Sequence, residues 1–244
     1  MADQLGESVG NTVGYRVRGD SKTSSQTRLE VVTQGILIRM LQDDPTLSDV
    51  TGVIFDEFHE RSLDADLGLT LMIEAQQVLR EDLKILIMSA TLDTRALLDL
   101  LGPETPLIEC PGRQWPVTTF YRNASLQTPP VTHQANVIIE ALAAHDGDIL
   151  VFLPGQREIR ELHNALASRL AEGIEVSPLY GQLPLAQQQE VLSASRQSCR
   201  RIILSTAIAE SSVTVPGVRI VVDSGRERVP IYQPRSGLTR LTTR

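Results

Sequence analysis

Short apolar runs alternate with amphipathic helical patterns along the whole chain, and this alternation constrains the fold more than any other feature of the sequence. Val53-Ile54-Phe55 is typical of a buried strand, and Ile85 to Met88 forms the next apolar run. Between these runs, apolar residues recur every three or four positions, which predicts an amphipathic helix. Its apolar stripe consists of Leu63, Leu67, Leu71, Ala75 and Val78. Strands that alternate with helices in this way predict βαβ units and a parallel sheet.

The same pattern appears on both sides of a proline-rich stretch at residues 103–132. Before it, Thr91 or Asp93 can cap a helix over 94–101, which Gly102-Pro103 ends. Within it, Val117 to Tyr121 is strand-like, but the prolines favour a linker, and we place a domain boundary near 125. The second half predicts helices over 133–144, 156–171 and 184–195, and strands at 149–153, 174–178, 201–204 and 218–222.

The sequence therefore predicts an α/β fold with two tandem domains that contain parallel sheets, residues 1–125 and 126–244. Ligands of open parallel sheets bind beyond the carboxyl ends of the strands. The residues that follow each predicted strand are consequently the first place to look for function.

The net charge of −7 at pH 7 argues against a protein that binds nucleic acid by bulk electrostatics. Two local runs are basic, however: residues 16–28, and residues 219–244 with six arginines against two acidic residues. Cys110 and Cys199 lie in no metal-binding or disulfide pattern, which fits a reducing compartment. We expect a cytoplasmic protein without a membrane partner, because no apolar run approaches the roughly 20 residues of a membrane span.

Two polar motifs follow the two apolar strands of the first half. Asp56-Glu57-Phe58-His59 comes directly after the first strand, and Ser89-Ala90-Thr91 follows the second. Asp56 can hold a magnesium ion, usually through water, and Glu57 can accept a proton from a water that attacks a γ-phosphate. Either motif alone would be interpreted as a helix or turn cap. Because both motifs meet at one edge of one sheet, a catalytic site is favoured over two separate caps.

These motifs resemble motifs II and III of the DEAH-box RNA helicases, and further segments extend the resemblance. The form of motif II, with Phe58 and with Glu60-Arg61-Ser62-Leu63 after it, is most similar to the bacterial HrpB-type branch. The resemblance implies two RecA-like domains and hydrolysis of ATP with Mg²⁺. The further segments are Val32 to Leu37 (similar to motif Ib), Ile149 to Gln156 (motif IV) and Leu204 to Val215 (motif V).

The resemblance also implies roles for single residues. His59, Ser89 and Thr91 belong to the catalytic motifs, and His59 would couple nucleotide state to the second domain. Thr214 would contact the nucleotide together with Asp56 and Glu57, although Pro216 stands where many DEAH proteins carry an acidic residue. The backbone of single-stranded RNA, or of DNA, would be contacted by Thr33, Gly35, Gly155, Thr206 and Ser212.

Two elements of such a motor are absent from these 244 residues: a phosphate-binding loop G-x-x-x-x-G-K-[ST] and a final arginine motif Q-R-x-G-R-x-G-R. We therefore expect this truncated chain to hydrolyse ATP negligibly by itself, since an arginine finger alone contributes roughly 10³–10⁵ in rate. Two alternatives to an RNA helicase remain open. One is a nucleic-acid-binding or interaction module without catalysis, and the other is a DNA-directed translocase.

Overall fold

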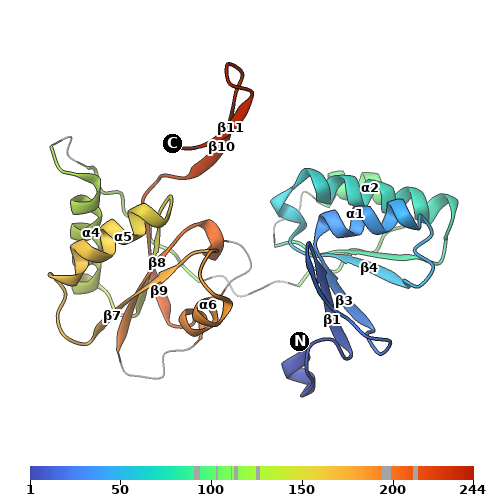
Figure 1. Ribbon diagram of the computed structural model, residues 1–244, viewed down its shortest axis with the longest axis horizontal. Helices are drawn as coiled ribbons and strands as arrows, with labels where there is room; N and C mark the ends of the chain where they lie inside the picture. Colours follow the sequence, from blue (N-terminus) through green and yellow to red (C-terminus); the bar gives the residue numbers. More distant parts are fainter. Residues whose placement is uncertain are drawn as a thin grey trace. The chain divides into compact units, whose positions relative to one another are not determined.

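The computed structural model describes residues 1–90, 94–102, 104–110, 112, 115–124, 127–193, 199–210 and 214–244, with the backbone alone for residues 94–96. The chain forms two compact units, residues 1–113 and 114–244 (Figure 1). The boundary that we predicted near residue 125 falls in the same segment between two helices, and it stays a prediction.

The first unit contains a small three-stranded sheet, a two-stranded parallel sheet and three α-helices. The three-stranded sheet has the order β2-β1-β3, in which β1 runs antiparallel to β2 and parallel to β3. The elements of the first unit are β1 (Val13–Val17), β2 (Asp20–Lys22), β3 (Leu29–Val32), α1 (Gln34–Asp43), β4 (Gly52–Phe55), α2 (Leu63–Val78), β5 (Lys84–Ile87) and α3 (Thr94–Leu101), with 3₁₀ turns η1 (Ala2–Leu5) and η2 (Phe58–Glu60).

Helices α1 and α2 lie side by side and cover the β4–β5 sheet (Figure 1). Strands β4 and β5 are parallel, with Ile54 opposite Leu86. The core contains Leu37 and Leu41 from α1, Met72 from α2, and Phe55 from the end of β4. The predicted strands and the intervening helix are confirmed, and so is the helix over 94–101.

The predicted apolar stripe of α2 was wrong at three of its five positions, since Ala75 is buried and Leu71 partly buried but Leu63, Leu67 and Val78 are exposed. Leu63 and Val78 are 82% and 72% exposed, whereas Leu69 and Met72 are 1% and 0% exposed. The helix carries apolar residues on nearly every side, so their spacing does not define one face, and contact with α1 decides which side is buried. The buried positions of α2 are Ala65, Gly68, Leu69, Met72, Ile73 and Ala75.

The second unit is an α/β layer built on a four-stranded parallel sheet of order β7-β8-β6-β9, with a separate antiparallel pair β10–β11. The predicted helices and strands of this half are confirmed, with ends that differ by a few residues. Its elements are α4 (Pro130–Ala144), β6 (Asp148–Phe152), α5 (Gln156–Ala167), β7 (Ile174–Leu179), α6 (Leu185–Leu192), β8 (Arg200–Ser205), η3 (Ala207–Ala209), β9 (Val218–Asp223), β10 (Arg228–Gln233) and β11 (Leu238–Thr243).

Strand β6 is buried on both faces, as expected of an interior strand in a parallel sheet. Ile149 and Val151 pack into the core formed with α4 and α5. Leu150 lies in the opposite core, which α6 partly covers. Because successive side chains of a strand point to opposite faces, this uninterrupted apolar run fills both layers.

A buried ion pair fastens the amino ends of β6 and β8. The Nε of Arg201 lies 2.8 Å from Oδ2 of Asp148, and the backbone N–H of Arg201 donates to Oδ1 at 2.9 Å. The same guanidinium donates to the carbonyl oxygens of Val191, Ser193 and Pro216. One side chain thus joins two strands, the end of α6 and the turn before β9.

The segment between α3 and α4 contradicts one prediction. Val117 to Tyr121 does not form a strand, and Val117 and Tyr121 are 86% and 87% exposed. A strand needs a neighbour that accepts and donates backbone hydrogen bonds, and the described residues offer this segment none.

Among the residues that the structure describes, no helix is both long and apolar enough to cross a membrane.

Candidate functional site

Asp56 and Glu57 form a short loop at the carboxyl end of β4, and Met88, the residue that follows the neighbouring strand β5, holds this loop on both sides. The backbone N–H of Met88 donates to the carbonyl oxygen of Phe55 at 2.8 Å, and the N–H of Phe58 donates to the carbonyl oxygen of Met88 at 3.0 Å. The two acidic residues therefore project from the sheet edge between two fixed points.

The acidic side chains are accessible. Asp56 is exposed, and its Oδ1 accepts the backbone N–H of Glu57 at 2.9 Å. The Glu57 side chain is half-buried, and its Oε2 lies 3.3 Å from Nδ1 of His59. A carboxylate that is partly exposed and sits beside an imidazole can exchange protons with a bound water.

The catalytic residues that the sequence predicted are brought together as far as the structure describes them. Ser89 follows Met88 directly and is half-buried beside the acidic loop. Thr91 lies outside the described residues, and so does Asp93, the alternative cap of α3. Within the described part of the chain, no group of three or more His, Cys, Asp or Glu side chains is placed to hold a metal ion.

The predicted nucleic-acid residues of the first unit lie at the beginning of α1. Thr33 is the N-cap residue, but its hydroxyl makes no capping hydrogen bond, and both Thr33 and Gly35 are exposed. They line a hollow of about 620 Å³ together with the side chains of Arg18 and Arg39. Backbone N–H groups at a helix N-terminus, a hydroxyl and two guanidinium groups are suited to phosphate oxygens, and Asp64 is the one acidic residue of this lining.

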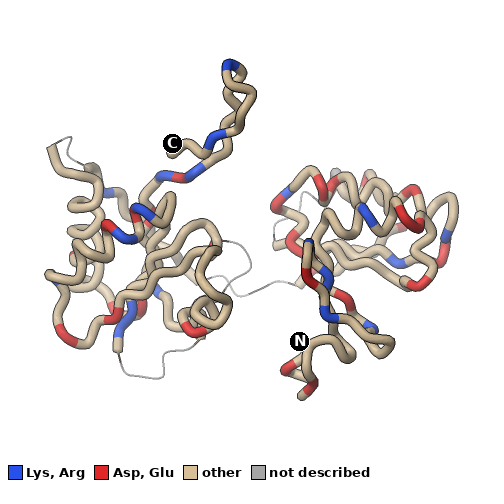
Figure 2. The backbone as a smooth tube through the Cα atoms, in the orientation of Figure 1, with Lys and Arg blue, Asp and Glu red and all other residues tan. Residues whose placement is uncertain are grey.

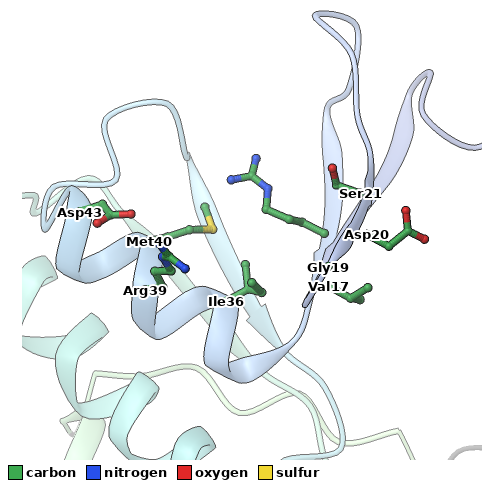
Figure 3. A pocket seen from close by; sticks show the side chains of 9 residues that line it. Val17, Gly19, Asp20, Ser21, Ile36, Arg39, Met40 and Asp43 are labelled. Carbon is green, nitrogen blue, oxygen red and sulfur yellow. The ribbon is translucent and has the colours of Figure 1, made fainter.

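A second hollow adjoins the first and lies between α1 and the β1–β2 hairpin (Figure 3). It shares Ile36 and Arg39 with the first hollow, and Arg16 and Ser21 line it from the hairpin side. Arg16 is paired with Glu30 at 2.8 Å, which leaves its charge partly neutralised. Arg18 therefore borders the end of α1 that carries Thr33, whereas Arg16 borders the hollow that extends along α1 to Asp43.

In the second unit, Gly155 and Thr206 follow the neighbouring strands β6 and β8 at the carboxyl edge of the sheet. Gly155 is the N-cap residue of α5, and the N–H of Thr206 donates to the carbonyl oxygen of Leu179 at 3.2 Å. Thr214 is exposed between η3 and β9, in the other unit from the acidic loop. Ser212 lies outside the described residues.

Two residues beside these sites were not predicted from the sequence. The guanidinium of Arg228 packs against Gly155, where a Cβ would come within 2.9 Å of it, and lies 3.6 Å from Glu158. Its place in the basic run at 219–244 was the available signal. Phe58 is 4% exposed beneath the acidic loop, and an aromatic residue between charged neighbours was the signal for its burial.

Comparison with known families agrees with this arrangement. Residues 2–100 match the DEAD/DEAH box helicase family, and residues 133–236 match the helicase conserved C-terminal domain. The chain belongs to the DEAD/DEAH-box helicases. The resemblance predicted from the motifs is confirmed, and so are the two tandem RecA-like domains.

Similar proteins include two curated bacterial helicases. The ATP-dependent RNA helicase HrpB of Escherichia coli is 47% identical over 249 residues, which cover 100% of this chain and 30% of that protein. The ATP-dependent RNA helicase HrpA homolog of Haemophilus influenzae is 35% identical over 243 residues, which cover 99% of this chain and 18% of that protein. The chain therefore spans less than a third of either relative.

Solved structures of Escherichia coli HrpB have the same fold. The crystal structure of the DEAH/RHA helicase HrpB superposes with a TM-score of 0.91 at 47% identity, over 100% of this chain and 31% of that one. The crystal structure of the DExH-box NTPase HrpB gives a TM-score of 0.85 at 47% identity, over 100% of this chain and 30% of that one.

Proposed function

We propose that this chain is part of an ATP-dependent RNA helicase, in which hydrolysis of ATP drives translocation along single-stranded RNA. The observation that carries the proposal is the acidic loop, which Met88 fixes from both sides at the carboxyl edge of β4 and β5. Two adjacent accessible carboxylates at such an edge lie where ligands of parallel sheets bind, and they can hold a cation and take a proton from a reacting water. Further support comes from the relatives, whose names state ATP-dependent RNA helicase.

Asp56 and Glu57 would divide the chemistry. The exposed carboxylate of Asp56 is a hard oxygen ligand that suits Mg²⁺, which commonly takes one or two carboxylates and completes its shell with water and phosphate oxygens. Mg²⁺ neutralises charge on the phosphates when it is bound. Glu57 would accept the proton of the attacking water, and Thr214 would contact the nucleotide.

His59, Ser89 and Thr91 would connect the acidic loop to the rest of the motor. The contact of 3.3 Å between His59 and Glu57 provides a direct path, because a change at the carboxylate alters the charge that faces the imidazole. Ser89 supports the same role, since it follows the residue that fixes the loop. The role of Thr91 rests on the family resemblance alone.

The nucleic-acid track would be held by small polar residues flanked by arginines. Thr33 and Gly35 line a hollow with Arg18 and Arg39, and Gly155 lies against Arg228, with Thr206 after the next strand. Figure 2 shows basic residues along the β1–β2 hairpin and along β10–β11. Such contacts neutralise phosphates without reading bases, which suits movement along any sequence. Ser212 completes the proposed set, and an RNA substrate is consistent with a cytoplasmic location.

The test uses the full-length protein, meaning this chain within a sequence of its relatives' length. Glu57→Gln should lower ATP turnover by about 10²–10⁴, the usual effect of losing an acid–base group, while a fluorescent ATP analogue still binds. Glu60→Gln is the matched control, because Glu60 is exposed three residues further along and has no proposed role. Normal turnover by the Glu57→Gln protein would refute the assignment of the base.

A further inference from the structure

Phe58 is the one large apolar side chain of the acidic loop, and its ring is buried while the residues on either side are not. Its exposure is 4%. The ring meets Phe55 edge-on, with centroids 6.1 Å apart and planes at 83°. The guanidinium of Arg61 lies over the same ring, 5.7 Å from its centroid. Phe58 is thus enclosed between the end of β4 and a charged cover.

The cover is itself fixed to α2. Both the Nε and the Nη2 of Arg61 lie 3.2 Å from the carboxylate oxygens of Asp66, in the first turn of that helix. Planar guanidinium groups pack well on aromatic faces, and a two-point contact with a carboxylate limits their rotation. The ring therefore has two defined neighbours, Phe55 and Arg61.

The backbone around Phe58 is held in an uncommon conformation. Glu57 has φ 51° and ψ 38°, and Arg61 has φ 50° and ψ 52°, so both ends of the 3₁₀ turn are left-handed. Leu47 is the only other described residue, apart from glycines, with positive φ. Residues other than glycine disfavour the left-handed region, and they remain in it only where the surrounding structure fixes their conformation. Here the fixed points are the Phe58 ring and its N–H bond to Met88.

We propose that Phe58 is a positioning residue for Glu57. Its buried ring and its hydrogen bond to Met88 hold the left-handed turn, and this turn sets where the Glu57 carboxylate projects from the sheet edge. The inference rests on the proposed role of Glu57 as the base. A base must lie within hydrogen-bond reach of the proton that it takes, so a small displacement costs rate without abolishing nucleotide binding.

The experiment measures kcat and KM for ATP in the full-length protein, with Mg²⁺ and saturating single-stranded RNA. Phe58→Ala should lower kcat by roughly 10- to 100-fold, as misplacement of a catalytic group does, with a much smaller change in KM. Phe58→Leu retains apolar volume and should recover part of the loss. Met72→Ala removes a fully buried side chain of the same core, on α2, and should leave kcat unchanged per folded molecule.

A double variant separates positioning from general destabilisation. If Phe58 acts through Glu57, then Phe58→Ala should cause no further fall in kcat when Glu57→Gln is already present. Equal falls in both backgrounds, or a Phe58→Ala protein that behaves like Met72→Ala, would overturn the role of Phe58. If Phe58→Ala does not fold, the same comparison is made with Phe58→Leu. Unchanged kcat in Glu57→Gln alone would instead remove the proposed function, and this role with it.

Discussion

Replacement of Arg201 by methionine should destabilise the second unit more than most single substitutions. Arg201 and Asp148 form a buried pair whose side chains are 5% and 11% exposed. Methionine fills a similar apolar volume but leaves the Asp148 carboxylate with the backbone N–H of residue 201 as its remaining partner in this contact. Removing one partner of a buried ion pair typically costs about 3–5 kcal/mol. That is a large part of the roughly 5–15 kcal/mol that stabilises a whole domain.

The measurement is urea unfolding followed by circular dichroism, with Asp148→Asn introduced in both backgrounds. In the unsubstituted chain Asp148→Asn weakens the ion pair and should lower the free energy of unfolding. In the Arg201→Met chain it removes an uncompensated buried charge, keeps an acceptor for the backbone N–H, and should raise that free energy. The sign of the effect therefore reverses. An effect of the same sign and size in both backgrounds would show that Arg201 does not stabilise the charge of Asp148.

Two further predictions concern the first unit. Arg39→Ala in the full-length protein should weaken binding of single-stranded RNA of every sequence and reduce the slope of log K against log salt by about 0.7. The control is Arg157→Ala on α5, which should change neither quantity, because the Arg157 side chain is 78% exposed and paired with Glu161. Hydrogen bonds from the Thr46 hydroxyl and the Ser48 backbone N–H lower the pKa of Asp44 well below its ordinary value of 3.8. The stabilisation by this carboxylate is present above its ordinary pKa and is lost as pH falls toward its folded pKa. In thermal unfolding, Asp44→Asn should therefore lower stability at neutral pH, and this loss of stability should shrink below about pH 4. A loss that stays constant with pH would contradict this prediction.

The parts of the fold that the sequence predicted are those decided by local pattern. Ile149 to Phe152 is apolar at every position, which suits a strand with both faces covered, and the structure confirms it. The helix over 94–101 is confirmed to the residue, since Gly102 ends it with φ 98°. The acidic loop was predictable too, because it follows an apolar strand directly.

The parts that the sequence could not predict are decided by distant neighbours. Strand β1 pairs with β3 through contacts such as Val13 with Leu29, and runs of only three to five residues carry little periodic signal. Leu63 could have faced either side of α2, and only α1 decides. Burial of Phe58 depends on Met88 and Arg61, which the chain brings to it from another strand and from the next turn.

The most direct test of the central claim is the rate of ATP hydrolysis by the full-length protein as single-stranded RNA is added. The rate should rise saturably with RNA, and Glu57→Gln should lower both the basal and the stimulated rate by about 10²–10⁴. A parallel titration with single-stranded DNA of the same sequence shows whether the 2′-hydroxyl is sensed. Hydrolysis that is independent of nucleic acid, or no hydrolysis under any condition, would contradict the account and favour a binding module without catalysis.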